Sequence, residues 1–131
     1  MEGLRTPTSV KDMLSSANAS VPKITAGEAR RLIDDEGALL IDVRDAPELE
    51  QTGKLKSAVN VSRGCLEFRA DDAAPSHNAE FRRDRPVILY CASGGRSALS
   101  AKVLQDMGYD QVYNLGGLKD AAEAGFETER A

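Results

Sequence analysis

The sequence has no tryptophan, a single histidine and only two cysteines, and it contains no apolar run long enough to cross a membrane. A zinc site would need several cysteines or histidines at short spacing, and neither Cys65 nor Cys91 has such a neighbour. Two cysteines in a chain rich in aliphatic residues do not form a disulfide framework. We therefore expect no metal site, and we expect both cysteines to be reduced thiols.

The chain also lacks an excess of charge of one sign. Its net charge is -4 with acidic and basic residues interspersed, which gives no basis for expecting nucleic-acid or membrane binding. The first residues lack the apolar core of a secretory signal, so we expect a cytoplasmic protein. The length of 131 residues is enough for one hydrophobic core. We expect an N-terminal extension with a short amphipathic helix over residues 1–20, followed by one domain over residues 21–131.

Strand-like and helix-like segments alternate along that domain. The strand candidates are VPKI, ALLIDV, SAVNV, PVILY and QVYNL, and the helix candidates between them cover residues 25–37, 45–53 and 97–108. Capping boxes at Thr25 with Glu28 and at Asp45 with Glu48 mark two of the helix starts. This alternation predicts an open α/β domain with a mostly parallel central sheet and helices on both faces. Such sheets bind ligands beyond the carboxyl ends of their strands.

Cys91 follows the apolar strand PVILY directly, within the segment VILYCASGGRSALSAKVLQ. A single cysteine at a strand end is ordinarily a small buried apolar residue, but three neighbouring features favour a thiolate here. A helix begins near Ser97, so its N-terminal amides carry partial positive charge. Gly94 and Gly95 allow the loop amides to turn inward, and Arg96 supplies a permanent cation. The pattern predicts a cradle for an anionic sulfur together with an anionic substrate.

The length of this loop separates two kinds of chemistry. Cysteine-dependent phosphatases carry a C-x5-R loop that surrounds a tetrahedral phosphate, whereas Cys91 and Arg96 enclose only four residues. A smaller ring fits a terminal sulfur on the cysteine better than a phosphoryl group. We therefore favour sulfur transfer over phosphoryl transfer.

Three segments of the chain resemble single-domain rhodaneses, which are sulfurtransferases: LLIDVRDAPELEQTGKLKSAVNV, RGCLEFR and VILYCASGGRSALSAKVLQDMGYDQVYNLGG. The resemblance spans roughly residues 21–126. It implies the rhodanese-like fold, with a five-stranded parallel sheet flanked by helices on both faces, and an enzyme that cycles through a cysteine persulfide. By position, Cys91 would carry the sulfur. The pocket around it would be formed by Ala92, Ser93, Gly94, Gly95 and Arg96.

In the expected reaction, the Cys91 thiolate attacks the outer sulfur of thiosulfate, polysulfide or a persulfide. Arg96 and the loop amides would hold the departing sulfite, and the persulfide would pass its sulfur to cyanide, a thiol or a sulfur-carrier protein. No metal or organic cofactor is needed. Two alternatives remain open: a phosphatase or arsenate reductase of the same fold, and a non-catalytic module that binds a partner protein.

Further residues are candidates for supporting roles. We expect Ser97 to cap the following helix, with a hydrogen bond to the persulfide as the alternative. Asp42 ends a strand and is expected to form a buried ion pair with Arg44, in a structural role. Cys65 follows another strand, so it could lie at the same edge of the sheet as Cys91 and either accept sulfur or form a disulfide with a Cys91 persulfide; the alternative is an inert thiol.

The chain departs from the rhodanese pattern at two places. GKLKSA stands where many rhodaneses have GHIPGA, and Ala92 follows the cysteine where some members have an arginine. Thiosulfate is therefore expected to be a poor donor. Arg63 and Arg69 are candidates to supply the missing charge at the site, with solvated surface residues as the alternative.

Overall fold

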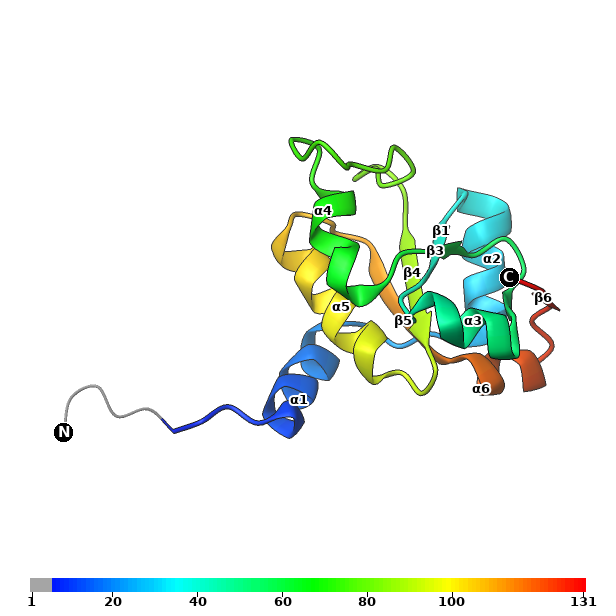
Figure 1. Ribbon diagram of the computed structural model, residues 1–131, viewed down its shortest axis with the longest axis horizontal. Coiled ribbons are helices and arrows are strands. Elements are labelled where there is room, and N and C mark those ends of the chain that lie inside the picture. Colours follow the sequence, from blue (N-terminus) through cyan, green and yellow to red (C-terminus); the bar gives the residue numbers. More distant parts are fainter. Residues whose placement is uncertain (1–5) are drawn as a thin grey trace.

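The computed structural model describes residues 6–131 as a four-stranded parallel sheet with helices packed on both faces (Figure 1). The α-helices are α1 (Val10–Ser20), α2 (Ala26–Glu36), α3 (Ala46–Thr52), α4 (Leu66–Ala70), α5 (Gly95–Asp106) and α6 (Leu118–Glu123), and one 3-10 helix, η1, covers Arg63–Cys65. The parallel α/β architecture predicted from the sequence is confirmed. None of the helices in this part of the chain is both long enough and apolar enough to span a membrane.

The sheet has the strand order β3-β1-β4-β5, and all neighbouring pairs are parallel. Its strands are β1 (Leu39–Asp42), β3 (Val59–Asn60), β4 (Val87–Cys91) and β5 (Val112–Gly117). A separate antiparallel pair is formed by β2 (Lys54–Leu55) and β6 (Thr128–Glu129). The two central strands, β1 and β4, are buried along their whole length, because helices cover both of their faces.

The expected count of five strands in the parallel sheet is wrong. The segment VPKI makes only an isolated parallel bridge, between Lys23 and Asn114 of β5. Two hydrogen bonds form it, from the Asn114 amide to the Pro22 carbonyl at 2.9 Å and from the Ile24 amide to the Asn114 carbonyl at 3.1 Å. Pro22 has no amide to donate, and the chain turns into α2 at its N-cap Thr25, so the ladder ends after one bridge.

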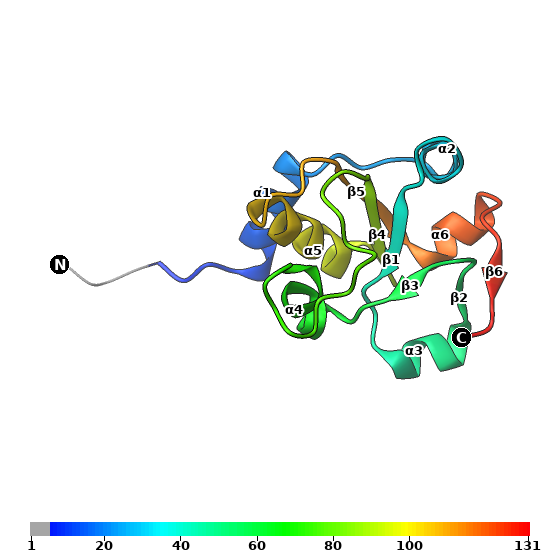
Figure 2. The same cartoon turned by 90° about the horizontal axis from the view of Figure 1, so that it is seen from above.

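The two faces of the sheet carry different helices (Figures 1 and 2). Helices α1, α4 and α5 lie on one face, and α2 and α6 lie on the other. Alternate side chains of β4 divide between the two hydrophobic clusters: Val87, Leu89 and Cys91 belong to the cluster on the α5 side, and Ile88 and Tyr90 to the other. The Cys91 side chain therefore points toward α5.

Local signals placed the starts of α2 and α3 correctly. In the predicted capping boxes, the Thr25 amide donates to Glu28 and the Asp45 amide donates to Glu48, each at 2.9 Å. The amphipathic helix expected in the N-terminal extension is α1, which packs against α5. Its Leu14 side chain lies next to Gly95, the first residue of α5.

Candidate active site

The candidate site surrounds Cys91, the last residue of β4, at the carboxyl end of the parallel sheet. Only 1% of the Cys91 surface is exposed. The Cys91 loop, residues 91–96, leads directly into α5, which begins at Gly95 with Gly94 as N-cap. The helix therefore starts two residues earlier than Ser97, where the sequence had indicated it. This brings the positive end of the helix closer to the thiol.

Two polar groups contact the Cys91 sulfur. The Gly94 amide donates to Sγ at 3.0 Å, and the Ser97 hydroxyl lies 3.5 Å from Sγ. Burial acts to raise the pKa of Cys91, but hydrogen bonds from the Ser97 hydroxyl and from the amides of Ser97, Gly94 and Ser93 outweigh it. The net result is a pKa below the ordinary value of a thiol, which favours the thiolate.

Ser97 does not cap the helix, so the expected capping role is wrong. Its side chain lies in the first turn of α5, fully buried, and the hydroxyl donates to Asn114 Oδ1 at 2.7 Å as well as contacting Cys91. Because a hydroxyl has one proton, Ser97 can donate to only one of these two acceptors at a time. Because α5 begins at Gly95, Ser97 lies within the first turn and not at the N-cap, and its hydroxyl lies near the Cys91 sulfur.

Asn114 is a component of the site that sequence reasoning missed. It lies on β5, 4% exposed, and its Nδ2 donates to the Gly94 carbonyl at 3.2 Å while Oδ1 accepts from the Gly116 amide at 3.0 Å. The side chain thus ties β5 to the Cys91 loop. A polar residue inside the otherwise apolar run VYNL was the available signal, because a buried amide needs partners.

Gly116 and Gly117, at the end of β5, allow the Cys91 loop to lie close to this strand. A Cβ on Gly117 would lie 2.6 Å from the Ala92 carbonyl oxygen, so no side chain fits there. On the loop itself, Gly94 has φ +105, a conformation that other residues rarely adopt, and a Cβ there would lie 3.3 Å from Gly116 Cα. These contacts give a physical reason for the glycines of NLGG at the end of β5 and for Gly94 in the segment SGG of the Cys91 loop.

The guanidinium of Arg96 makes a contact that was not expected. Its Nη1 and Nη2 donate to the two carboxylate oxygens of Glu48 on α3, at 2.8 and 2.9 Å. Arg96 first, and then the Asp45 amide, lower the pKa of Glu48 to about 2, and the same ion pair raises the pKa of Arg96. Arg96 was expected to face the substrate, but in this structure its bidentate fork holds a carboxylate of the protein.

Asp42 and Arg44 form the ion pair that the sequence suggested. Both are buried, and Nη2 of Arg44 lies 2.8 Å from Oδ2 of Asp42. Arg44 also donates to the Thr52 hydroxyl and the Gly53 carbonyl, each at 2.7 Å. These bonds fix α3 against the end of β1, and through α3 they hold Glu48 in place.

The other candidate residues have partners away from the thiol. Arg63 pairs with Glu67 at 2.9 Å, and Arg69 donates to the Ser76 carbonyl at 3.3 Å. Cys65 is exposed at the end of η1. Among residues 6–131, none of these three is hydrogen-bonded to the Cys91 sulfur.

Lys23 is a cation near the site that the sequence did not indicate. Its Cε and Nζ lie 3.6 and 4.0 Å from the position that a Cβ on Gly116 would occupy, and Gly116 Cα lies 3.3 Å from the position that a Cβ on Gly94 of the Cys91 loop would occupy. Lys23 reaches this place only because its segment bridges to β5. That pairing joins residues distant in sequence, so no local pattern reveals it.

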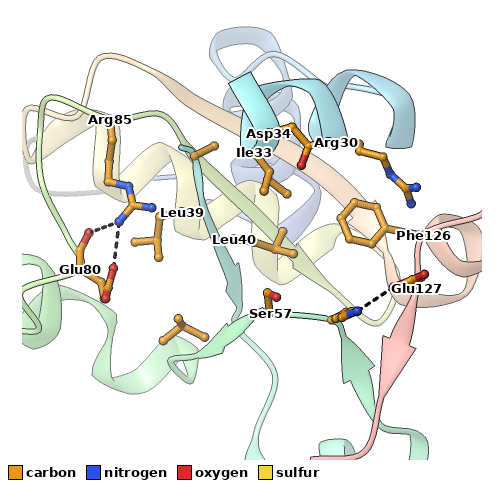
Figure 3. A pocket seen from close by; sticks show the side chains of 13 residues that line it. Arg30, Ile33, Asp34, Leu39, Leu40, Ser57, Glu80, Arg85, Phe126 and Glu127 are labelled. Atoms are coloured by element: carbon orange, nitrogen blue, oxygen red, sulfur yellow. Dashed lines mark hydrogen bonds and ion pairs between the residues drawn. The ribbon is translucent and has the colours of Figure 1, made fainter. Parts of the chain in front are cut away.

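A cavity of about 500 Å³ lies elsewhere, beside the amino-terminal half of β1 (Figure 3). Its apolar lining includes Ile33, Leu39, Leu40 and Phe126. Charged residues at this cavity pair with each other, as in the Arg85–Glu80 contact at 2.9 Å and the contact of Lys56 with Glu127 at 3.2 Å. Within the described part of the chain, no group of three or more His, Cys, Asp or Glu residues is arranged to hold a metal ion.

Comparison with known proteins relates the chain to one family. The model of the rhodanese-like domain family matches residues 25–124. A sulfurtransferase of Allochromatium vinosum is 34% identical over 89 residues, covering 68% of this chain and 75% of the relative. A thiosulfate sulfurtransferase of Escherichia coli is 37% identical over 82 residues, covering 63% of this chain and 72% of the relative.

A solved structure from Rhodopseudomonas palustris is similar over almost the whole chain. It superposes with a TM-score of 0.85 at 36% identity, covering 98% of this chain and 99% of that one. That protein is described as being of unknown function and a possible tyrosine phosphatase. The similar proteins therefore carry names from both of the chemistries that the length of the Cys91 loop distinguishes.

Proposed function

The chain belongs to the rhodanese-like family, and we propose that it is a sulfurtransferase in which Cys91 carries the transferred sulfur as a persulfide. The observation that carries this proposal is the environment of the thiol. Cys91 is almost fully buried, and the Gly94 amide and the Ser97 hydroxyl both contact its sulfur. These donors, with the N-terminus of α5, stabilise a negative charge on Sγ and on a second sulfur attached to it.

The proposed first step is attack of the Cys91 thiolate on the outer sulfur of the donor. A new S–S bond forms between Cys91 Sγ and the outer sulfur of the donor. The S–S bond within the donor breaks, and its electron pair leaves with the rest of the donor molecule. Thiosulfate would release sulfite, and a thiol persulfide would release the thiol or thiolate. In the second step, cyanide or a thiolate, including a thiolate of a sulfur-carrier protein, attacks the outer sulfur; the S–S bond to Cys91 breaks, its electron pair returns to the Cys91 sulfur, and the product is thiocyanate or a new persulfide. The names of the A. vinosum and E. coli relatives support the reaction class and thiosulfate as one donor to test.

Phosphatase chemistry is the alternative that the similar structure from R. palustris makes worth testing. Two features of this chain oppose it. The Cys91 loop has four residues between cysteine and arginine, and both terminal nitrogens of Arg96 are engaged with Glu48. A phosphoryl group in transfer needs those donors to balance its developing charge.

The test is intact-mass spectrometry after incubation with thiosulfate and, separately, with glutathione persulfide. The proteins compared are the wild type, Cys91→Ser and Cys65→Ser, the last of which removes the exposed thiol and leaves the buried one. We expect a gain of one sulfur atom in the wild type and in Cys65→Ser, and no gain in Cys91→Ser. Loss with either substitution would make Cys65 a participant.

A folded wild-type protein that gains no sulfur from either donor would refute the proposed function. Hydrolysis of p-nitrophenyl phosphate that disappears in Cys91→Ser would then establish the phosphatase alternative. Absence of both activities would favour the non-catalytic binding module.

A further inference from the structure

Glu48 connects two parts of the fold that are separate in sequence. It lies at the third position of α3, where its Oε2 accepts the Asp45 amide at 2.9 Å as part of a capping box. The same oxygen accepts Arg96 Nη1 at 2.8 Å, while Oε1 accepts Nη2 at 2.9 Å. A single carboxylate thus caps one helix and occupies the side chain of the arginine in the Cys91 loop.

Capping alone does not require this arrangement. Glu28 occupies the equivalent position of α2 and accepts the Thr25 amide at 2.9 Å, with no arginine side chain hydrogen-bonded to it among residues 6–131. Glu48 therefore makes a second contact that Glu28 lacks. That contact bears on the electrostatics of the Cys91 loop, because Arg96 is the only charged side chain between Cys91 and Ser97.

The two classes of sulfur donor differ in what they demand of Arg96. Thiosulfate carries two negative charges and releases sulfite, which leaves with two, so its approach and departure both require a cation with free donors. The persulfide of a thiol carries at most one negative charge on its sulfur pair and releases a thiol or thiolate. The pair of Arg96 with Glu48 has no net charge. It therefore attracts thiosulfate poorly, and it attracts thiol persulfides about as well as a neutral site would.

We propose that Glu48 is a specificity-determining residue that neutralises Arg96 and thereby selects thiol persulfides over thiosulfate as sulfur donors. This inference rests on the proposed function. The carboxylate acts through Arg96 and does not itself touch the reacting sulfur, so Glu48 is a positioning residue. Its exposed fraction of 35% and that of Arg96, 39%, leave the ion pair open to solvent, so a small oxyanion meets the carboxylate when it approaches the guanidinium.

The test measures the first half-reaction separately for each donor. The rate constant for formation of the Cys91 persulfide is determined with thiosulfate and with glutathione persulfide, for the wild type, Glu48→Gln and Glu28→Gln. Glu28→Gln is the matched control, because it removes one charge from an equivalent capping box on another helix. We expect Glu48→Gln to raise the thiosulfate rate constant about tenfold, equivalent to about 1.4 kcal/mol, and to change the persulfide rate constant by less than about threefold.

A purely structural role for Glu48 predicts a different outcome. Loosening of α3 or of the Cys91 loop would lower both rate constants together, and that result, or an unchanged ratio of the two, would overturn the inference. Glu28→Gln should leave the ratio at its wild-type value. If the wild type takes sulfur from neither donor, the proposed function itself fails, which the mass measurement on the wild type distinguishes from a failure of donor selection.

A measurement on the wild-type protein keeps the inference testable if Glu48→Gln does not fold. Sulfate has the shape and charge of thiosulfate but lacks its outer, transferable sulfur, so it reports whether Arg96 is available to a divalent oxyanion. We expect sulfate to compete only weakly, so that adding it hardly changes the rate of persulfide formation from glutathione persulfide. Strong competition by sulfate in the wild type would show that Arg96 is available despite Glu48, and would refute the proposal.

Discussion

The contact between Ser97 and Cys91 makes a quantitative prediction about thiol reactivity. Replacing Ser97 with alanine removes the hydroxyl that lies 3.5 Å from Sγ and leaves the Gly94 amide, at 3.0 Å, as the closest donor. The hydroxyl favours the thiolate, so its removal must raise the pKa of Cys91. The buried Asn114 oxygen is not left without a partner, because it still accepts the Gly116 amide at 3.0 Å.

The size of the shift follows from the strength of one hydrogen bond to a charged acceptor. Such a bond contributes about 1.5–3 kcal/mol, which corresponds to a factor of roughly ten to a hundred in an equilibrium constant. The long distance to Sγ and the competing acceptor on Asn114, at 2.7 Å from the same hydroxyl, place the expected shift at the lower end. We therefore expect Ser97→Ala to raise the pKa of Cys91 and to lower the thiolate fraction at a pH below that pKa by about tenfold.

The assay is the pH dependence of alkylation by iodoacetamide, followed by mass spectrometry in a Cys65→Ser background so that Cys91 is the only thiol. The matched control is Ser100→Ala, which removes another buried hydroxyl of α5 whose bond, at 2.6 Å, goes to the Arg96 carbonyl. We expect the alkylation profile to move to higher pH in Ser97→Ala and to stay in place in Ser100→Ala. An unchanged profile in Ser97→Ala, or equal shifts in both variants, would refute the assignment of Ser97 as a donor to the sulfur.

Three further predictions concern stability. The pKa of Glu48 falls from its ordinary value of 4.5 to about 2 in the folded protein, so its contribution to the free energy of unfolding is fully present above pH 4.5 and is lost as the pH falls toward 2. In urea denaturation at a series of pH values, Glu48→Gln should reduce the dependence of the unfolding free energy on pH over this range. Asp42→Ala leaves Arg44 buried without its partner and should cost about 3–5 kcal/mol of unfolding free energy, and a loss below about 1 kcal/mol would contradict the ion pair. Gly117→Ala places a Cβ against the Ala92 carbonyl, so it should lower the melting temperature and the rate of persulfide formation together, whereas full activity would mean that the loop can move aside.

Much of the fold and the location of the site could be predicted from sequence, because the signals are local. Apolar runs such as ALLIDV and PVILY mark buried parallel strands, and capping boxes at Thr25 and Asp45 mark the helix starts. Each of these features depends on residues within a few positions of one another. The position of Cys91 at the carboxyl end of its strand follows from the same local pattern.

Local signals were misleading where two elements compete for the same residues. The segment VPKI has the composition of a strand, but Pro22 and the capping residue Thr25 leave it only one bridge to β5. Likewise, Ser97 has the residue type of a cap, but the glycine pair allows the helix to begin at Gly95. In both cases the neighbouring element decided the outcome.

The order of residue types is enough to specify the alternation of strands and helices, the parallel sheet and the placement of a thiol in a glycine loop at its carboxyl edge. The groups that surround that thiol depend on tertiary packing. Arg96 binds a carboxylate 48 positions away in the sequence, and Ser97 donates to a side-chain amide 17 positions away. These partners come from α3, which precedes the Cys91 loop in the chain, and from β5, which follows it. Such pairings depend on how whole elements pack, and the residue types alone do not state which partner each charge or hydroxyl will find.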